Sequence, residues 1–395
     1  MRGERERAML KVAFVTPGAY AVPSAMGGSV ERVVEKVVPL LVPRVDARIY
    51  GRTARRLPKQ ERWRGVRCER FPAASKSAYF RRVCRRLRAF RPHIIQVENR
   101  PLWVPKLKRL FPDSRIWLNL HSTTFISRPY LSAEARSRCL SSADRIVVNS
   151  HFLKDVISGL VPRTAARIRV NHLGVDLERF SERSEPEDDE QRSSDLRKGR
   201  WNNRKVVLYV GRLVPQKGVH HLLGAMKDIV REHPDVLVVI VGGARYGSKR
   251  GSAYVEKLKR MARPWEKHVH FEPYAPHDQI HRWYEKADVA VVPSVGKEAF
   301  GLVNVEAMAS RLPVVATAAG GIKEVVADGE TGFLISARKE EIRKQLADKV
   351  DGLLKDEELR IKMGKCGRER VERLFTWQRT SDRWIELAKE GMHDR

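Results

Sequence analysis

Short apolar runs of three to six residues recur along this chain, and each is followed by a segment with apolar residues at helical spacing. These runs are residues 11–16, 93–97, 116–120, 146–148, 168–170, 206–210, 236–241, 268–271, 289–292 and 314–316. Regular alternation of this kind predicts parallel sheets covered by helices. Because the pattern restarts after a polar interval, we predict an α/β protein with two doubly wound, Rossmann-like domains.

The polar interval sets the predicted domain limits. After Phe180 the composition becomes acidic, rich in serine and arginine, and poor in apolar residues, which is typical of a solvated linker. We predict an N-terminal domain over 1–180, a linker over 181–204, a C-terminal domain over 205–375, and a helix over 376–395 that packs back toward the N-terminal domain. The acidic cluster at 187–189 follows no strand, so we expect no metal site there.

Composition narrows the class of protein. Apolar residues make up 42% of the 395, enough for sizeable cores, and no apolar run approaches the length of a membrane span. The first residues lack the apolar core of a signal peptide, which favours a cytoplasmic protein. The four cysteines are scattered without a Cys-x-x-Cys pair, so neither a zinc site nor a disulfide framework is expected.

The chain is strongly basic, with 77 lysines and arginines against 48 acidic residues and a net charge of +29. Such a charge attracts polyanions. It is densest at 81–91, where Phe80, Val83, Cys84, Leu87 and Phe90 fall at helical spacing among arginines. This segment is either an ordinary surface helix or a dock for an anionic membrane or polymer. Specific nucleic-acid binding is not expected, since no recognition motif accompanies the charge.

The run at 289–292 ends at a proline and leads through a glycine-containing turn into a helix. The first amides of that helix lie near Phe300, Gly301 and Leu302, where they can bind an anion. Glu298 could simply complement the helix dipole. Glu306 stands among apolar neighbours and needs polar partners, which ribose hydroxyls would provide. The segment therefore favours a ligand that is part phosphate and part polyol.

Three further groups are candidates for the same site. Arg212 and Lys217 follow the strand 206–210 and suit a diphosphate, although a solvated turn is the alternative. Gly27 and Gly28 precede a helix and permit close approach of an anion. His121 ends the strand 116–120, as either a site residue or an imidazole satisfied elsewhere.

Taken together, these motifs are recognisable. They are Gly211-Arg212 with Lys217-Gly218, Pro293-Ser294, Glu298 and Glu306 around Phe300-Gly301-Leu302, Gly320-Gly321 with Glu324-Val325-Val326, and the earlier Gly27-Gly28, His121, 148–150 and 173–180. Over residues 10–388 the sequence resembles the retaining GT-B glycosyltransferases of family four. Segments 22–24, 99–108 and 232–236 resemble the spore-coat-associated subgroup.

The resemblance implies a role for each candidate. Arg212 and Lys217 would hold the donor diphosphate, and Glu306 the ribose hydroxyls. Glu298 would hold the transferred sugar and nearby phosphate together with the amides of Ala299, Phe300, Gly301 and Leu302. Gly27 and Gly28 would close on the phosphates, and His121 would face the sugar. Tyr274 would border the base, although Pro273 stands where the family usually has glycine. The catalytic set is Glu298, His121, Arg212 and Lys217.

The resemblance also implies a GT-B fold with two domains facing across a cleft. The expected reaction moves a hexosyl unit from a nucleoside-diphosphate sugar to an acceptor hydroxyl, with retention and without metal or cofactor. The acceptor would be a glycan, a lipid-linked molecule or a protein, as in spore-coat or cell-envelope glycan synthesis. The alternatives are a catalytically silent coat or scaffold protein that binds anionic polymer, and a sugar phosphorylase of similar architecture.

Overall fold

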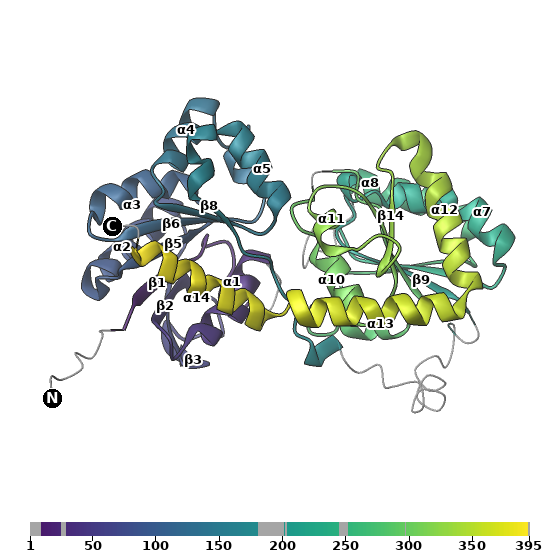
Figure 1. The fold of residues 1–395 in the computed structure, drawn as a ribbon, viewed down its shortest axis with the longest axis horizontal. Coiled ribbons are helices and arrows are strands. Elements are labelled where there is room, and N and C mark those ends of the chain that lie inside the picture. The colour runs from purple at the N-terminus through teal and green to yellow at the C-terminus, as the bar shows by residue number, and fades with distance from the viewer. Residues whose placement is uncertain are drawn as a thin grey trace. The chain divides into compact units, whose positions relative to one another are not determined.

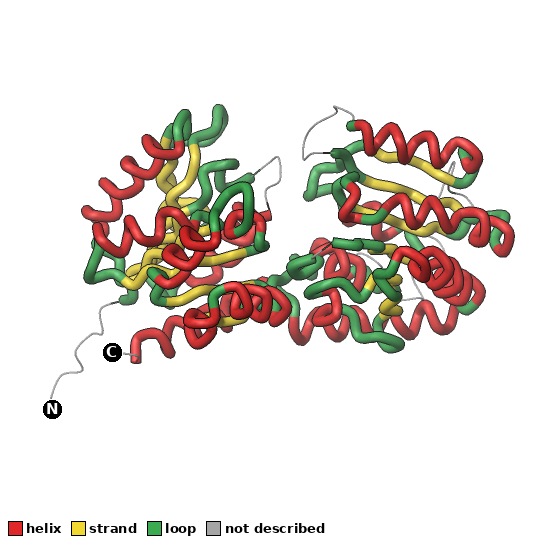
Figure 2. The backbone as a smooth tube through the Cα atoms, turned by 90° about the horizontal axis from the view of Figure 1, so that it is seen from above, coloured by secondary structure: helices red, strands yellow, loops and turns green. Residues whose placement is uncertain are grey.

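The computed structural model describes residues 9–24, 29–180, 201, 204–244, 252–296 and 298–393 (Figure 1). The chain divides into two compact units. The N-terminal unit comprises residues 1–172 and 377–395, and the C-terminal unit comprises residues 173–376. Figure 2 shows helices on both sides of the strands in each unit.

The N-terminal unit is built on an eight-stranded sheet in the order β3-β4-β2-β1-β5-β6-β7-β8. Its strands are β1 Lys11–Val15, β2 Asp46–Arg52, β3 Gln60–Trp63, β4 Val66–Phe71, β5 Ile94–Glu98, β6 Arg115–Leu120, β7 Arg145–Val148 and β8 Ile168–Val170. All neighbours are parallel except β3, which runs antiparallel to β4. The strand order reverses between β1 and β5, which creates a crevice at their carboxyl ends.

Three of the helices described in this unit begin at a serine cap. The helices are α1 Ser29–Leu41, α2 Lys76–Phe90, α3 Val104–Leu110, α4 Ala133–Ser141, α5 His151–Leu160 and α14 Trp377–His393. Ser75, Ser132 and Ser150 each accept a hydrogen bond from an amide in the first turn of α2, α4 and α5. Helix α2 buries Val83 and Leu87 and exposes arginines, so its apolar positions are explained by core packing.

Helix α14 belongs to the N-terminal unit although it follows the C-terminal unit in sequence. It packs against α1. The buried ring of Trp384 lies 5.4 Å from that of Phe14 and 5.5 Å from that of Trp117, measured between centroids. The last helix therefore supplies a central part of this core.

The C-terminal unit contains a fully parallel six-stranded sheet in the order β11-β10-β9-β12-β13-β14. Its strands are β9 Val206–Val210, β10 Leu237–Val241, β11 Val269–Glu272, β12 Val289–Val292, β13 Val314–Thr317 and β14 Gly332–Ile335. This is the doubly wound order, and it reverses between β9 and β12. A ligand of such a fold binds outside the carboxyl ends of those two strands.

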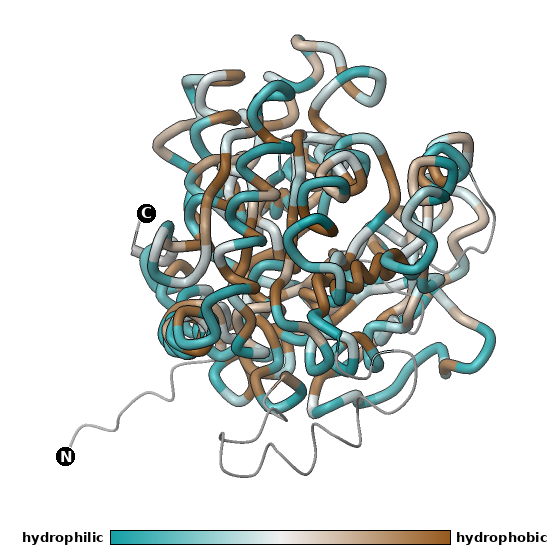
Figure 3. The backbone as a smooth tube through the Cα atoms, turned by 90° about the vertical axis from the view of Figure 1, so that its right-hand side faces the viewer, coloured by the Kyte–Doolittle hydropathy of each residue, from teal (hydrophilic) through white to brown (hydrophobic). Residues whose placement is uncertain are grey.

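The helices of the C-terminal unit are α7 Val219–Glu232, α8 Ala253–Ala262, α9 His281–Glu285, α10 Leu302–Ala309, α11 Ile322–Val325, α12 Lys339–Lys355 and α13 Glu357–Leu374. In Figure 3 the colours along the helices alternate between hydrophobic and hydrophilic, as expected for helices with one buried face. The core joins the valines of β9, β10 and β12 to α7 and α12, through residues such as Leu222 and Leu346.

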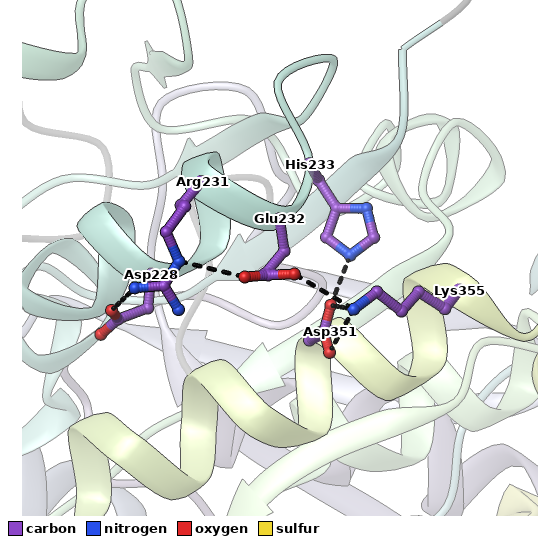
Figure 4. Close-up of polar contacts among 6 residues, drawn as sticks. All are labelled: Asp228, Arg231, Glu232, His233, Asp351 and Lys355. Atoms are coloured by element: carbon purple, nitrogen blue, oxygen red, sulfur yellow. Dashed lines mark hydrogen bonds and ion pairs between the residues drawn. The ribbon is translucent and has the colours of Figure 1, made fainter.

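A surface network links the ends of α7 and α12 (Figure 4). Lys355 bonds both Glu232, at 3.2 Å, and Asp351, while Arg231 bonds Glu232 at 3.0 Å. His233 is buried, and its Nε2 lies 2.9 Å from Asp351 Oδ1. Hydrogen bonds from Arg231 and Lys355 lower the pKa of Glu232. The network therefore ties the last turn of α7 to the last turn of α12.

The domain limits differ from the sequence prediction at one end. Residues 173–180, predicted to end the N-terminal domain, belong to the C-terminal unit. Val175 pairs with Thr376, and the ring of Phe180 packs edge-on against Tyr284 at 5.8 Å. The predicted linker 181–204 lies outside the described residues except for Trp201 and Arg204. Among the described residues, no helix combines the length and apolarity needed to cross a membrane.

Candidate functional site

Two loops meet at the carboxyl ends of β9 and β12. The first, residues 211–218, follows β9, and the second starts at Pro293 after β12. The N–H groups of Val295 and Gly296 both donate to the carbonyl of Gln216, at 3.0 and 3.2 Å. The loop predicted to bind phosphate is therefore joined by backbone hydrogen bonds to the loop that carries Glu298.

Gly218 allows this junction to form. It has φ +71°, and a Cβ atom there would lie 1.8 Å from the carbonyl oxygen of Pro293. We expect Gly218→Ala to destabilise the protein by roughly 2–5 kcal/mol, from left-handed strain and overpacking. Thermal unfolding measures this loss of stability. The matched control is Gly352→Ala in α12, where a Cβ meets nothing within 4 Å, and which should stabilise by roughly 0.5–1 kcal/mol. Equal stability of the two variants would contradict the junction.

Lys217 and Glu298 form an ion pair across the two loops. Their side chains are 25% and 19% exposed, so both can still reach a ligand. Arg212 belongs to the same loop, is exposed, and has its carbonyl held by the hydroxyl of Tyr209 at 2.9 Å. The structure thus brings together two residues that the sequence analysis assigned to different parts of a ligand.

Helix α10 begins beside this pair. Gly301, at φ +89°, precedes its first residue, Leu302, so the predicted amides lie where the helix N-terminus offers N–H groups. The amide of Gly321 donates to the carbonyl of Glu298 at 2.9 Å, and a Cβ on Gly320 would lie 2.1 Å from that carbonyl oxygen. The two glycines thus let a neighbouring turn pack tightly on the loop from Glu298 through Ala299 and Phe300.

Two buried polar atoms lie near the same turn without partners among the described residues. They are Oγ of Ser294, just after β12, and Oδ1 of Asn304 in the first turn of α10. The side-chain Nδ2 of Asn304 donates to the carbonyl of Gly301 at 3.1 Å. Buried polar groups are usually satisfied, so these atoms are consistent with a site that binds a polar ligand.

Glu306 lies on α10 and is almost fully buried. The hydroxyl of Tyr284 donates to its Oε2 at 3.0 Å, and Nδ1 of His277 lies 3.8 Å from its Oε1. Burial, then the charge of Glu306, raise the pKa of Tyr284 well above its ordinary value, which keeps the phenol a donor. The carboxylate that the sequence analysis expected to need polar partners therefore has Tyr284 at Oε2 and His277 beside Oε1.

Sequence reasoning did not find Tyr284 and His277. Tyr284 is on the short helix α9, and His277 is in the loop before it, three residues after the half-buried Tyr274. No spacing motif links them to Glu306, since the sheet brings these segments together. The only signal was that a carboxylate among apolar residues requires donors. Tyr274 remains a predicted base contact.

The N-terminal unit positions His121 at the end of β6. Nε2 of His121 lies 2.9 Å from Oε2 of Glu98, the wholly buried last residue of β5. The amide of His121 donates to Oδ1 of Asn99 at 3.0 Å. Sequence reasoning missed Glu98, although an acidic residue ending an apolar strand was a usable signal. Gly27 and Gly28 lie outside the described residues and remain predictions.

Glu31 on α1 is buried and accepts a hydrogen bond from the amide of Tyr20 at 3.2 Å. Burial raises its pKa, which that hydrogen bond and the charge of Arg100 oppose only in part. A carboxyl whose folded pKa is raised stabilises the fold at low pH, and that contribution is lost as pH rises through the folded pKa. We expect Glu31→Gln to gain stability relative to the wild type as pH rises from about 4 to 7.

Chemical denaturation across this pH range tests the prediction for Glu31. Glu35→Gln is the control, because Glu35 lies one turn further along α1, is less buried, and accepts a similar bond from Ser24. A pH-independent difference between Glu31→Gln and the wild type would show that burial does not govern the carboxyl.

Comparison with known proteins agrees with this geometry. The model of the group 1 glycosyl transferases matches residues 191–370, and that of glycosyltransferase family 4 matches residues 26–179. Spore coat protein SA of Bacillus subtilis strain 168 is 31% identical over 382 residues, covering 97% of this chain and 100% of that protein. The putative glycosyltransferase YtcC of the same strain is 32% identical, covering 95% of this chain and 90% of that protein.

Solved structures show the same fold. Anabaena HepE in complex with UDP has a TM-score of 0.76 at 20% identity, covering 96% of this chain and 100% of that one. Sucrose-phosphate synthase from Thermosynechococcus elongatus has a TM-score of 0.75 at 22% identity, covering 96% and 98%. The chain therefore belongs to the group 1 glycosyltransferases, with a family 4 N-terminal region, and has the GT-B fold.

Proposed function

We propose that this protein transfers a hexosyl unit from a nucleoside-diphosphate sugar to an acceptor hydroxyl, with retention and without a metal ion. The observation that carries the proposal is the ion pair of Lys217 and Glu298 at the reversal of strand order, beside the start of α10. It places a cation, a carboxylate and helix amides where ligands of doubly wound sheets bind. HepE, a structural relative, was solved with UDP and with UDP-glucose, which supports this class of donor.

Each part of the donor would meet a different group. The departing diphosphate gains negative charge, which Arg212, Lys217 and the first amides of α10 would stabilise. Once a phosphate approaches Lys217, Glu298 would be released to accept hydroxyls of the sugar. The carboxylate of Glu306, which Tyr284 holds at Oε2, would take the ribose hydroxyls.

Retention would follow from departure and attack on the same face of the sugar. The departing phosphate would then accept the proton of the acceptor hydroxyl, so no carboxylate nucleophile is needed. The acceptor oxygen bonds to the anomeric carbon as the bond between that carbon and the phosphate oxygen breaks, and the diphosphate leaves with the bonding electrons. The acceptor class stays open among glycans, lipid-linked molecules and proteins.

The test is turnover of UDP-, GDP- and ADP-hexoses, read as release of nucleoside diphosphate, with NMR of the product's anomeric configuration. We expect one donor to be consumed and its configuration to be kept. Inversion would refute retention. Turnover that requires orthophosphate and yields a sugar phosphate would favour a phosphorylase. A chelator should leave the rate unchanged, and loss of activity restored by a divalent cation would refute metal independence.

A second candidate function is a silent coat or scaffold protein that binds anionic polymer. Its support is the likeness to spore coat protein SA and the net charge of +29. Salt-sensitive retention on an anionic polymer, without consumption of any donor, would favour it. Exposed arginines of α2, such as Arg81, Arg85 and Arg88, are where such a polymer or an anionic membrane would bind.

A further inference from the structure

The partner of His121 is the end of a longer chain of buried hydrogen bonds. Indole Nε1 of Trp384 donates to Oε1 of Gln96 at 2.7 Å. Nε2 of Gln96 donates to Oε1 of Glu98 at 2.7 Å, and Oε2 of Glu98 lies 2.9 Å from Nε2 of His121. Trp384, Gln96 and Glu98 are all nearly or fully buried.

The chemistry of each group fixes the direction of this chain. An indole N–H can only donate, so the oxygen of Gln96 must face Trp384 and its NH₂ group must face Glu98. An ionised carboxylate can only accept, so its second oxygen receives the proton on Nε2 of His121. The carboxylate of Glu98 therefore sets the tautomer of the imidazole, while the indole of Trp384 fixes the amide of Gln96 that holds this carboxylate in place.

The backbone of His121 is held as well. Its amide donates to Asn99, and its carbonyl accepts from Nδ2 of Asn149 at 3.4 Å. Within the described residues, Nδ1 of His121 makes no hydrogen bond and is not among the buried unpartnered atoms. With Nε2 committed to Glu98, Nδ1 is the nitrogen left for a substrate.

We propose that Glu98, Gln96 and Trp384 are positioning residues that hold His121 in its Nε2-protonated tautomer and present Nδ1 to a substrate hydroxyl. Helix α14, which returns to the N-terminal unit from the far end of the chain, is then part of the support of this site and not only of the core. The tautomer of His121 does not depend on the proposed function. The contact of Nδ1 with a sugar hydroxyl does rest on the proposed function.

Nitrogen-15 NMR of the imidazoles tests the tautomer directly. The signal of His121 is the one missing from His121→Gln. In the wild type, near neutral pH, we expect a protonated Nε2 and an unprotonated Nδ1. In Glu98→Gln only one oxygen is left to accept hydrogen bonds. If that oxygen keeps the bond from Gln96, the new NH₂ group faces the imidazole and donates to Nε2. The His121 signal should then shift toward the Nδ1-protonated form. An Nδ1-protonated wild type, or no shift in Glu98→Gln, would overturn the proposal.

Trp384→Phe tests the far end of the chain. It removes the indole donor but keeps a ring against Phe14, so Gln96 holds the carboxylate less firmly. The Nε2 signal of His121 should then shift while Nε2 stays protonated. The control is Trp117→Phe, the same substitution in the same aromatic cluster. If Trp117→Phe changes the His121 signal as much as Trp384→Phe does, the effect is one of packing and the hydrogen-bond chain is refuted.

Kinetics separate this inference from the proposed function. With a donor that is turned over, Glu98→Gln should lower kcat by at least about 10-fold with little change in KM, since misplacing a group that holds the reacting sugar can cost about 10²-fold in rate. A change confined to KM would overturn the role on substrate. If no donor is turned over, the proposed function is wrong, but the NMR experiment still tests the tautomer because it needs no turnover.

Discussion

We expect Lys217→Met to lower kcat/KM for the sugar donor by roughly 10²- to 10³-fold, the effect of removing one preorganised group that stabilises developing charge. The ammonium of Lys217 is held by Glu298 at the reversal of strand order, so it is in place before a diphosphate arrives. Steady-state release of nucleoside diphosphate measures the loss. Methionine keeps the length of the side chain, and the fold should survive because Glu298 is partly exposed.

The matched control for this prediction is Lys227→Met, on the exposed side of α7. It removes one positive charge from the same unit and should leave kcat/KM within about 2-fold, since distant exposed charges are largely screened. If Lys217→Met also retains near-normal turnover while both variants unfold at the wild-type temperature, the diphosphate does not bind at this lysine.

We expect Glu306→Gln to weaken binding of the nucleoside diphosphate by roughly 10- to 150-fold, which corresponds to about 1.5–3 kcal/mol for hydrogen bonds to a charged group. The amide can still accept from Tyr284 but has lost the charge that would receive the ribose hydroxyls. Calorimetry with the diphosphate measures the change. Tyr284→Phe, which leaves the carboxylate intact, should weaken binding much less.

Inorganic pyrophosphate gives the sharper comparison, because it has no ribose. Its affinity should be unchanged in Glu306→Gln and reduced in Lys217→Met. If Glu306→Gln weakens pyrophosphate and nucleoside diphosphate equally, Glu306 acts on the phosphates or on the fold, and its assignment to ribose is wrong.

Much of this architecture follows from the sequence, for identifiable reasons. Valine-rich runs such as 206–210 and 289–292 are buried on both faces, so their pattern is unmistakable. The strands β2, β3 and β4 were not predicted, because Asp46–Arg52, Gln60–Trp63 and Val66–Phe71 carry charged residues near the edge of the sheet. Strand β14, Gly332–Ile335, was also not predicted, because it is short and lies next to a glycine-containing turn.

The site was predictable to the extent that it consists of local motifs. A loop that follows a strand can be recognised from its glycines and charged residues, as in 211–218. Contacts set by topology do not: the pairing of Lys217 with Glu298, the phenol of Tyr284 on Glu306, and the link from Trp384 to Glu98 each join segments far apart in sequence. Such pairs depend on strand order, which spacing along the chain does not encode.

We expect the C-terminal unit to bind a nucleoside diphosphate at the carboxyl ends of β9 and β12. Calorimetric titration of the full chain with UDP, GDP and ADP tests it most directly. We expect at least one to bind at a single site, with pyrophosphate competing, and to stabilise the fold by about 2.7 kcal/mol at 100 times its Kd. A folded protein that shows no heat and no stabilisation with any of the three would contradict it.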